Sequence, residues 1–384
     1  MNQPHIGIAG AGLAGRMLAW RLALSGCRVS LFDAKHRDDL TSASQTAAAM
    51  LSPLAELAVS DDAVFELGQR SLQLWPQYLA QLSTPVYFRQ DGTVVVAHAQ
   101  DGASLEHFSR LLRHKLPTAC KPQVQALDAA ALAQVEPLLA GRFNGGLYLA
   151  GEGQLANDQL MAALAIELDR LGAQWHEGKA VEGVEYQHIV CADRKHAVDV
   201  AVDARGVGSK SALPALRGVR GEVLRVECKG VTLNRPVRLM HPRYQLYVAP
   251  RPNGEFVVGA TELESEDAGP VTVRSVLELG SALHSLHPAF GEARVLRMSA
   301  ALRPALDDHQ PAVVQRDGVW HINGLYRHGY LCAPALVDDL ASALTFTPTL
   351  SRTLSRRLCL QVRETEQDAA LRFPVPSPSG KGLG

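Results

Sequence analysis

The chain has 384 residues, 47% of them hydrophobic and 20% charged, which is the composition of a globular protein with room for two domains. Its formal net charge of −1 argues against a general nucleic-acid or anionic-membrane surface. The six cysteines are scattered without zinc-site spacing and the apolar runs are short or interrupted, so we expect no metal, no transmembrane segment and a cytoplasmic protein.

Residues 5–33 have the pattern of a strand, a glycine turn, a helix and a second strand that ends in an acid. This pattern is the dinucleotide-binding fingerprint. The first glycine allows a tight turn, the second lets the backbone approach a pyrophosphate, and the third lets helix and strand pack closely. The acid is placed to accept hydrogen bonds from a ribose diol. The expected dinucleotide contacts are Gly10, Gly12, Leu13, Ala14, Gly15 and Asp33.

The next part of the chain mixes small-residue, helical and strand patterns. Residues 34–56 are polar, then small, then apolar, which suits either a loop close to a flat ligand or a flexible connection. The spacing of apolar residues predicts a helix over 61–82. Two β-rich runs flanking Asp91-Gly92 predict a hairpin over 86–97.

The rest of the chain continues with helices, strands and a polar tail. Residues 219–262 alternate like antiparallel strands, with turns at 243–244 and 252–254. Residues 371–384 are rich in Pro, Gly and Ser, and we expect them to be disordered. Further helices are expected over 103–112, 128–134, 160–171, 271–287 and 333–344, the third capped by Asn157 or Asp158. Further strands are expected over 172–176, 199–213, 294–299 and 318–323.

This order is a nucleotide-binding fold that is interrupted by an antiparallel sheet and completed near the C-terminal end. We therefore predict an α/β protein with a split Rossmann-type domain, an interleaving more typical of flavoproteins than of nicotinamide enzymes. The nucleotide-binding domain is expected to comprise residues 1–80, 145–215 and 295–370. The inserted substrate domain is expected to comprise 81–144 and 216–294.

With these elements in place, the chain resembles the D-amino acid oxidase family of FAD-dependent amine oxidoreductases, most of all its glycine oxidase and D-amino acid dehydrogenase members. The resemblance covers nearly the whole chain. Leu325 stands where family members often have His, and Ala301 where they often have Gly. The segments that carry it are the fingerprint through Asp33, Ala48-Ala-Met50-Leu-Ser-Pro53, Tyr247-Val-Ala-Pro-Arg251, Gly259-Ala-Thr261-Glu262, Leu302-Arg303-Pro304 and Asn323-Gly-Leu-Tyr-Arg327-His-Gly329.

The resemblance implies a noncovalently bound FAD, because Cys332 does not match a covalent attachment site. It also implies that Arg303 and Arg327 bind a substrate carboxylate, for which a planar arginine fork is suited. Tyr247 is expected to place its hydroxyl near the same carboxylate, with packing in the core as the alternative. The residues expected around the flavin are Ala48, Ala49, Met50, Gly206, Gly324, Arg327, His328, Gly329, Tyr330 and Leu331.

The activity that the resemblance implies is oxidative deamination of glycine or another small D-amino acid, with hydride transfer to flavin N5. Oxygen or another acceptor would then take the electrons. The alternative is a maturation factor or monooxygenase that modifies a residue of a partner protein. Two carboxylate-binding arginines favour the free amino acid, because a peptide-bonded residue offers them no carboxylate. No nucleic-acid partner is expected, and a homo-oligomer or a protein partner is left open.

Overall fold

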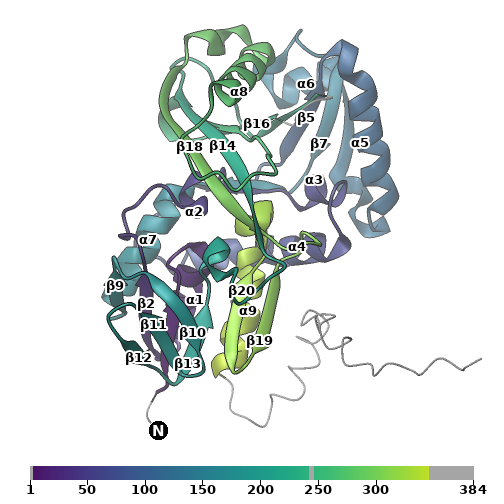
Figure 1. Cartoon of the computed structure of the whole chain (residues 1–384). Helices are drawn as coiled ribbons and strands as arrows, with labels where there is room; N and C mark the ends of the chain where they lie inside the picture. Colours follow the sequence, from purple (N-terminus) through teal and green to yellow (C-terminus); the bar gives the residue numbers. More distant parts are fainter. Residues whose placement is uncertain (1–2, 242–245, 346–384) are drawn as a thin grey trace, which may run out of the picture.

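The computed structural model of the chain describes residues 3–241 and 246–345. Figure 1 shows two parts: a lower one with the N-terminal strands and an upper one with a second, larger sheet. The strands of the described residues form sheets of six, three, eight and three strands. The predicted turn at 243–244 and the predicted disordered tail lie outside the described residues.

The six-stranded sheet builds the lower part and has the order β19-β20-β13-β1-β2-β9. Strand β1 is parallel to both β2 and β13, as in a nucleotide-binding sheet. Helices α1, α4, α7 and α9 pack together beside it. The strands are β1 (His5–Ala9), β2 (Arg28–Asp33), β9 (Gln174–Glu177), β13 (Val200–Asp203), β19 (Ala312–Arg316) and β20 (Val319–Asn323). The helices are α1 (Leu13–Leu24), α4 (Asp62–Leu79), α7 (Asn157–Arg170) and α9 (Gly329–Thr345).

The eight-stranded sheet builds the upper part and has the order β18-β14-β17-β16-β15-β5-β7-β6. Its pairs are antiparallel except β15 with β5. The strands are β5 (Thr93–Ala97), β6 (Val124–Asp128), β7 (Gly145–Leu149), β14 (Arg217–Glu227), β15 (Val237–Met240), β16 (Leu246–Pro250), β17 (Glu255–Gly259) and β18 (Arg294–Ala305). The neighbouring helices are α5 (Gly102–Lys115), α6 (Ala129–Val135) and α8 (Val273–Leu286).

Smaller elements connect the two parts. The segment that follows β2 forms α2 (Ala43–Thr46), β3 (Met50–Leu51) and α3 (Pro53–Leu57), with β3 pairing to β8 (Gly153–Leu155). Long strands β14 and β18 run from the upper part toward the lower one (Figure 1). The remaining elements include β4 (Phe88–Arg89), β10 (Val181–Glu185), β11 (His188–Cys191), β12 (Lys195–Ala197) and the 3₁₀ turns η4 (Gly206–Ser209), η5 (Pro252–Gly254) and η7 (Tyr326–His328).

Three sequence predictions are wrong. The strand expected over 199–213 ends at Asp203, and residues 206–209 form a 3₁₀ turn instead. The hairpin over 86–97 does not form, because β4 pairs with β8 while β5 is inserted between β15 and β7. Strand β5 is buried along its whole length and therefore takes a partner on each edge. The cap of α7 is also wrong: Asn157 lies in the helix, and its side-chain amide donates to the carbonyls of Ser44 and Gln45 at 3.1 and 2.8 Å.

The domain division stays a proposal. Two strands that it assigns largely to the nucleotide-binding domain are part of the other sheet. Strand β7 begins at residue 145 and β18 at residue 294, and both are hydrogen-bonded into the eight-stranded sheet. Strands β10 to β12 and β19 were not predicted. Within the described ranges, no helix combines the length and apolarity needed to cross a membrane.

Candidate active site

The glycine turn after β1 has no room for a side chain at two of its glycines. Gly10 has a φ of +97°, and a Cβ there would lie 2.5 Å from the carbonyl oxygen of Ala204. A Cβ on Gly15 would lie 1.9 Å from the carbonyl oxygen of Gly10, so α1 packs directly against the turn. Helix α1 starts after Gly12, which has no side chain to cap it. The positive end of its dipole faces the turn, and such a helix end favours a bound pyrophosphate.

Asp33 and Ser44 hold this turn in place. One carboxylate oxygen of Asp33 accepts the Ala11 N–H at 2.7 Å, and the other accepts the Lys35 N–H at 2.9 Å. The Ser44 hydroxyl accepts the Leu13 N–H at 2.9 Å. Ser44 was not predicted as a site residue, because its contact depends on a loop folding back onto α1.

A cavity of about 1590 Å³ is lined by residues of the six-stranded and the eight-stranded sheet. Of the predicted residues, Gly15 and Gly324 do not line it: Gly15 packs beneath the turn, and a Cβ on Gly324 would lie 2.7 Å from the side chain of Leu306. The glycine turn proposed to bind the dinucleotide and the residues proposed to bind the substrate thus line one space. The predicted residues that line it are Gly10, Gly12, Leu13, Ala14, Asp33, Ala48, Ala49, Met50, Gly206, Tyr247, Arg303, Arg327, His328, Gly329, Tyr330 and Leu331.

The small-residue segment at 48–50 is held against the cavity by a buried arginine. Arg251 donates to the carbonyl of Ala48 and, at 2.6 Å, to the side chain of Gln154. Burial lowers the pKa of Arg251 to about 10. Ala49 has a φ of +50°, which a residue with a Cβ rarely adopts. The small side chains keep this backbone close to the cavity.

Arg303 lies on β18 and has hydrogen-bonding capacity to spare. Its Nη2 donates to the carbonyl of Thr261 at 3.1 Å. Its Nη1 is buried and has no hydrogen-bond partner among the described residues. A buried donor without an acceptor is unfavourable, and a carboxylate is the acceptor that matches a guanidinium. Arg303 therefore suits an anionic ligand of the cavity that it lines.

Arg327 already has two carboxylate partners from the chain itself. Its Nε is 3.1 Å from Glu56, and its Nη1 is 3.1 Å from Glu262. Glu262 also accepts the Tyr326 hydroxyl at 2.6 Å, and Glu56 pairs with Arg238 at 3.2 Å. A ligand carboxylate at Arg327 would have to share it with these groups.

The Tyr247 phenol lies over the backbone of the neighbouring strand. Tyr247 and Gly259 are cross-strand partners, and a Cβ on Gly259 would lie 2.8 Å from the tyrosine hydroxyl. Burial raises the pKa of Tyr247, so its hydroxyl stays a hydrogen-bond donor at neutral pH. Met50 packs with Tyr247 and Ala48 in a small apolar cluster.

Glu56, which pairs with Arg327 and Arg238, has a strongly lowered pKa. Burial alone would raise its pKa, but Arg327, His328 and Arg238 outweigh burial and lower it from 4.5 to about 2. Burial lowers the pKa of His328 from 6.5 to about 4. Both groups bind fewer protons when the chain is folded than when it is unfolded, so acid favours unfolding.

We therefore expect the free energy of unfolding to fall as the pH drops, first from 6.5 toward 4 through His328 and then from 4.5 toward 2 through Glu56. The Glu56 part corresponds to roughly 3 kcal/mol. Urea unfolding of wild type and Glu56→Gln with saturating FAD, at pH 7 and pH 3, measures it. The gap between the two proteins should shrink at pH 3, whereas Glu66→Gln on the exposed face of α4 should match wild type at both.

One wall of the cavity comes from a loop that the sequence analysis did not single out. Arg220 is 2% exposed and donates to the carbonyls of Asp267, Gly269 and Pro270 at 2.6, 2.9 and 2.5 Å. Gly269 and Pro270 line the cavity. The turn residues at 267–270 were a usable signal. The role of Arg220, the buried arginine that fixes this turn, could not be predicted, because no local sequence pattern indicates it.

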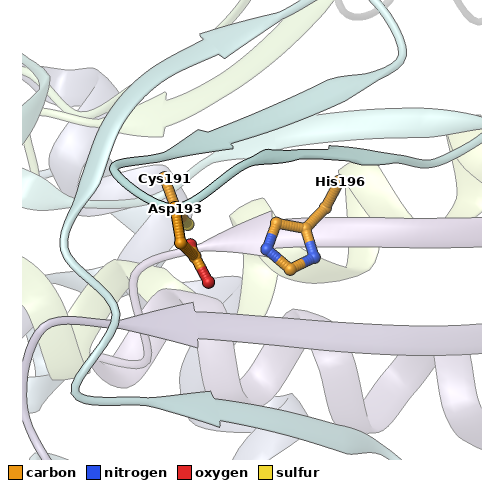
Figure 2. Close-up of side chains that lie close together, drawn as sticks. All are labelled: Cys191, Asp193 and His196. Carbon is orange, nitrogen blue, oxygen red and sulfur yellow. The ribbon is translucent and has the colours of Figure 1, made fainter.

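A separate group of side chains lies at the turn between β11 and β12 (Figure 2). Potential ligand atoms of Cys191, Asp193 and His196 lie within 4.8 Å of one another. The scattered cysteines and histidines of the sequence did not predict this grouping. Lys179 already pairs with Asp193 at 2.7 Å, and burial raises the pKa of the Cys191 thiol. A cation would have to displace an ammonium group and a thiol proton, so we assign no metal to it.

The fold and the cavity are those expected of a dinucleotide-binding protein, since the glycine turn and the side chains proposed to bind a substrate line one space. The family described as FAD dependent oxidoreductase (DAO) matches residues 5–343, and the chain belongs to this family. The predicted FAD dependence is thereby confirmed, and the glycine turn and the small-residue segment fit the cofactor.

Individual relatives agree with the family. The chain is 40% identical over 337 residues to the putative thiamine biosynthesis oxidoreductase ThiO of Rhizobium etli, covering 88% of this chain and 95% of that protein. It is 26% identical over 355 residues to glycine oxidase of Geobacillus kaustophilus, covering 87% and 92%. The crystal structure of Geobacillus kaustophilus glycine oxidase has the same fold, with a TM-score of 0.77 at 23% identity over 91% of this chain and 98% of that one. The predicted fold class is confirmed, and the protein is an FAD-dependent oxidoreductase of the glycine oxidase/ThiO type.

Proposed function

We propose that this protein oxidises the carbon–nitrogen bond of glycine or another small amino acid. The observation that carries the proposal is the buried Nη1 of Arg303, which lacks a partner among the described residues and belongs to a side chain that lines the cavity. A free amino acid supplies the carboxylate that this donor lacks. The names of the relatives, glycine oxidase and a thiamine biosynthesis oxidoreductase, support a small substrate and a place in thiamine biosynthesis.

FAD, when bound, accepts the hydride from the substrate carbon. Its phosphates would be held by Gly10, Gly12 and the start of α1, and its ribose by Asp33. The carbon–hydrogen bond breaks with its electron pair, the amine loses a proton, and a carbon–nitrogen double bond forms. Water then hydrolyses the imine to an oxo acid and ammonia.

The side chains of this wall bind and orient the substrate. Arg303 would receive the carboxylate, with the neutral Tyr247 hydroxyl as a second donor. Arg327, held by Glu56 and Glu262, would add positive charge beside the carboxylate while its own geometry stays fixed. Positioning of this kind can supply several kcal/mol of the barrier reduction without any acid or base from the chain.

The test is anaerobic mixing of the FAD-loaded protein with glycine, sarcosine and D-alanine. The flavin absorbance should bleach with at least one of the three, fastest with the substrate that best fits the cavity. Acetate, which has the carboxylate but no amine, is the control and should shift the spectrum without bleaching it. Flavin that stays oxidised with every small amine, together with a stoichiometric protein partner from the native host, would overturn the proposal in favour of a protein-modifying flavoprotein.

A further inference from the structure

Gly221 occupies a position in a strand interior where glycine is unfavourable. It lies within β14, and it is not among the described glycines with positive φ. Its backbone therefore does not require glycine, and an interior glycine weakens a strand. The reason for glycine here must be the space above it.

That space is taken by Arg303. A Cβ on Gly221 would lie 2.3 Å from the guanidinium carbon of Arg303, 2.3 Å from its Nη2 and 2.7 Å from its Nη1. Real Cβ atoms do not approach other atoms this closely. The guanidinium group is thus in van der Waals contact with the bare backbone of β14.

The sheet order explains why the arginine passes this point. Strand β14 lies between β18, which carries Arg303, and β17. The side chain starts opposite Val219 and ends at the carbonyl of Thr261, just beyond β17. It therefore crosses β14, and it crosses at Gly221.

We infer that Gly221 is a positioning residue for substrate binding: it lets the Arg303 guanidinium lie flat across β14, where its unused donor meets the substrate carboxylate. This inference rests on the proposed function of Arg303. A methyl group at residue 221 would lift the guanidinium away from the Thr261 carbonyl and move its donors. Misplacement of a binding group by about 1 Å can cost about a hundredfold in rate.

The experiment measures acetate binding to the FAD-loaded protein through the change in the visible flavin spectrum. Gly221→Ala should raise the Kd for acetate by roughly 10- to 100-fold, with a similar rise in KM for glycine and a smaller effect on kcat. FAD content and melting temperature should stay close to wild type. Gly218→Ala is the matched control on the same strand, because its Cβ would meet only the flexible Leu302 side chain at 3.3 Å. It should leave acetate binding unchanged.

A conservative change in the arginine separates positioning from a general disturbance of β14. In an Arg303→Lys background the forked group that collides with residue 221 is gone, so Gly221→Ala should change acetate binding by less than about threefold. An equal effect of Gly221→Ala in both backgrounds, or no effect with Arg303 present, overturns the inference. If acetate binds as expected but no amino acid reduces the wild-type flavin, the proposed function fails while this inference stands. A wild-type protein that binds no acetate but is still reduced by glycine overturns this inference and leaves the proposed function standing.

Discussion

Arg303→Ala is expected to lower kcat/KM for small amino acids by about 30- to 1,000-fold while FAD stays bound. The size follows from the loss of a charged hydrogen-bonding partner, about 2–4 kcal/mol, from the stabilisation of the bound carboxylate. The loss should be much smaller for amines without a carboxylate, because they leave nothing unpaired when the guanidinium is removed.

Steady-state rates with glycine and with a simple alkyl amine, together with the flavin content of each preparation, measure this effect. Arg294→Ala is the matched control, since Arg294 lies on the same strand β18 with its side chain exposed. It removes the same charge and should leave kcat/KM within about twofold. If the Arg303→Ala variant turns over glycine at the wild-type rate, the carboxylate-binding group lies elsewhere, with Arg327 as the next candidate.

Gly15→Ala is expected to yield protein that does not retain FAD. The added Cβ would lie 1.9 Å from the carbonyl oxygen of Gly10, which is backbone and cannot swing away as a side chain can. Either α1 or the glycine turn must move, and both are proposed to hold the dinucleotide. The start of the helix then no longer meets the phosphates, so we expect FAD affinity to fall by about a hundredfold or more.

The flavin-to-protein absorbance ratio after desalting, and the Kd for added FAD, report this loss, while circular dichroism reports whether the fold is kept. Gly102→Ala at the start of α5 is the control, because a Cβ there meets nothing within 4 Å. A Gly15→Ala protein that folds and keeps its FAD would show that the contact between α1 and the turn relaxes without affecting the site.

Elements with a strong local pattern were predicted well. The unit β1–α1–β2 follows the expected boundaries closely, and the helices α4, α5, α6 and α8 lie where the spacing of apolar residues placed them. Strand β5 shows where local reading failed. Its Thr-Val-Val-Val-Ala sequence is correctly a strand, but the neighbouring Asp91-Gly92 turn does not specify its partners, which come from β7 and β15.

The sequence by itself determined the turn that we propose to bind the dinucleotide, because its glycines, its helix and its closing acid lie within residues 5–33 and act through local geometry. Only the tertiary structure decided how the two arginines proposed to bind the substrate carboxylate differ. Arg327 meets Glu56 and Glu262, which lie 271 and 65 positions away, whereas Arg303 crosses a strand at Gly221 and keeps an unused donor. Such pairings depend on which strands the fold brings side by side, and no local pattern of residues encodes that choice.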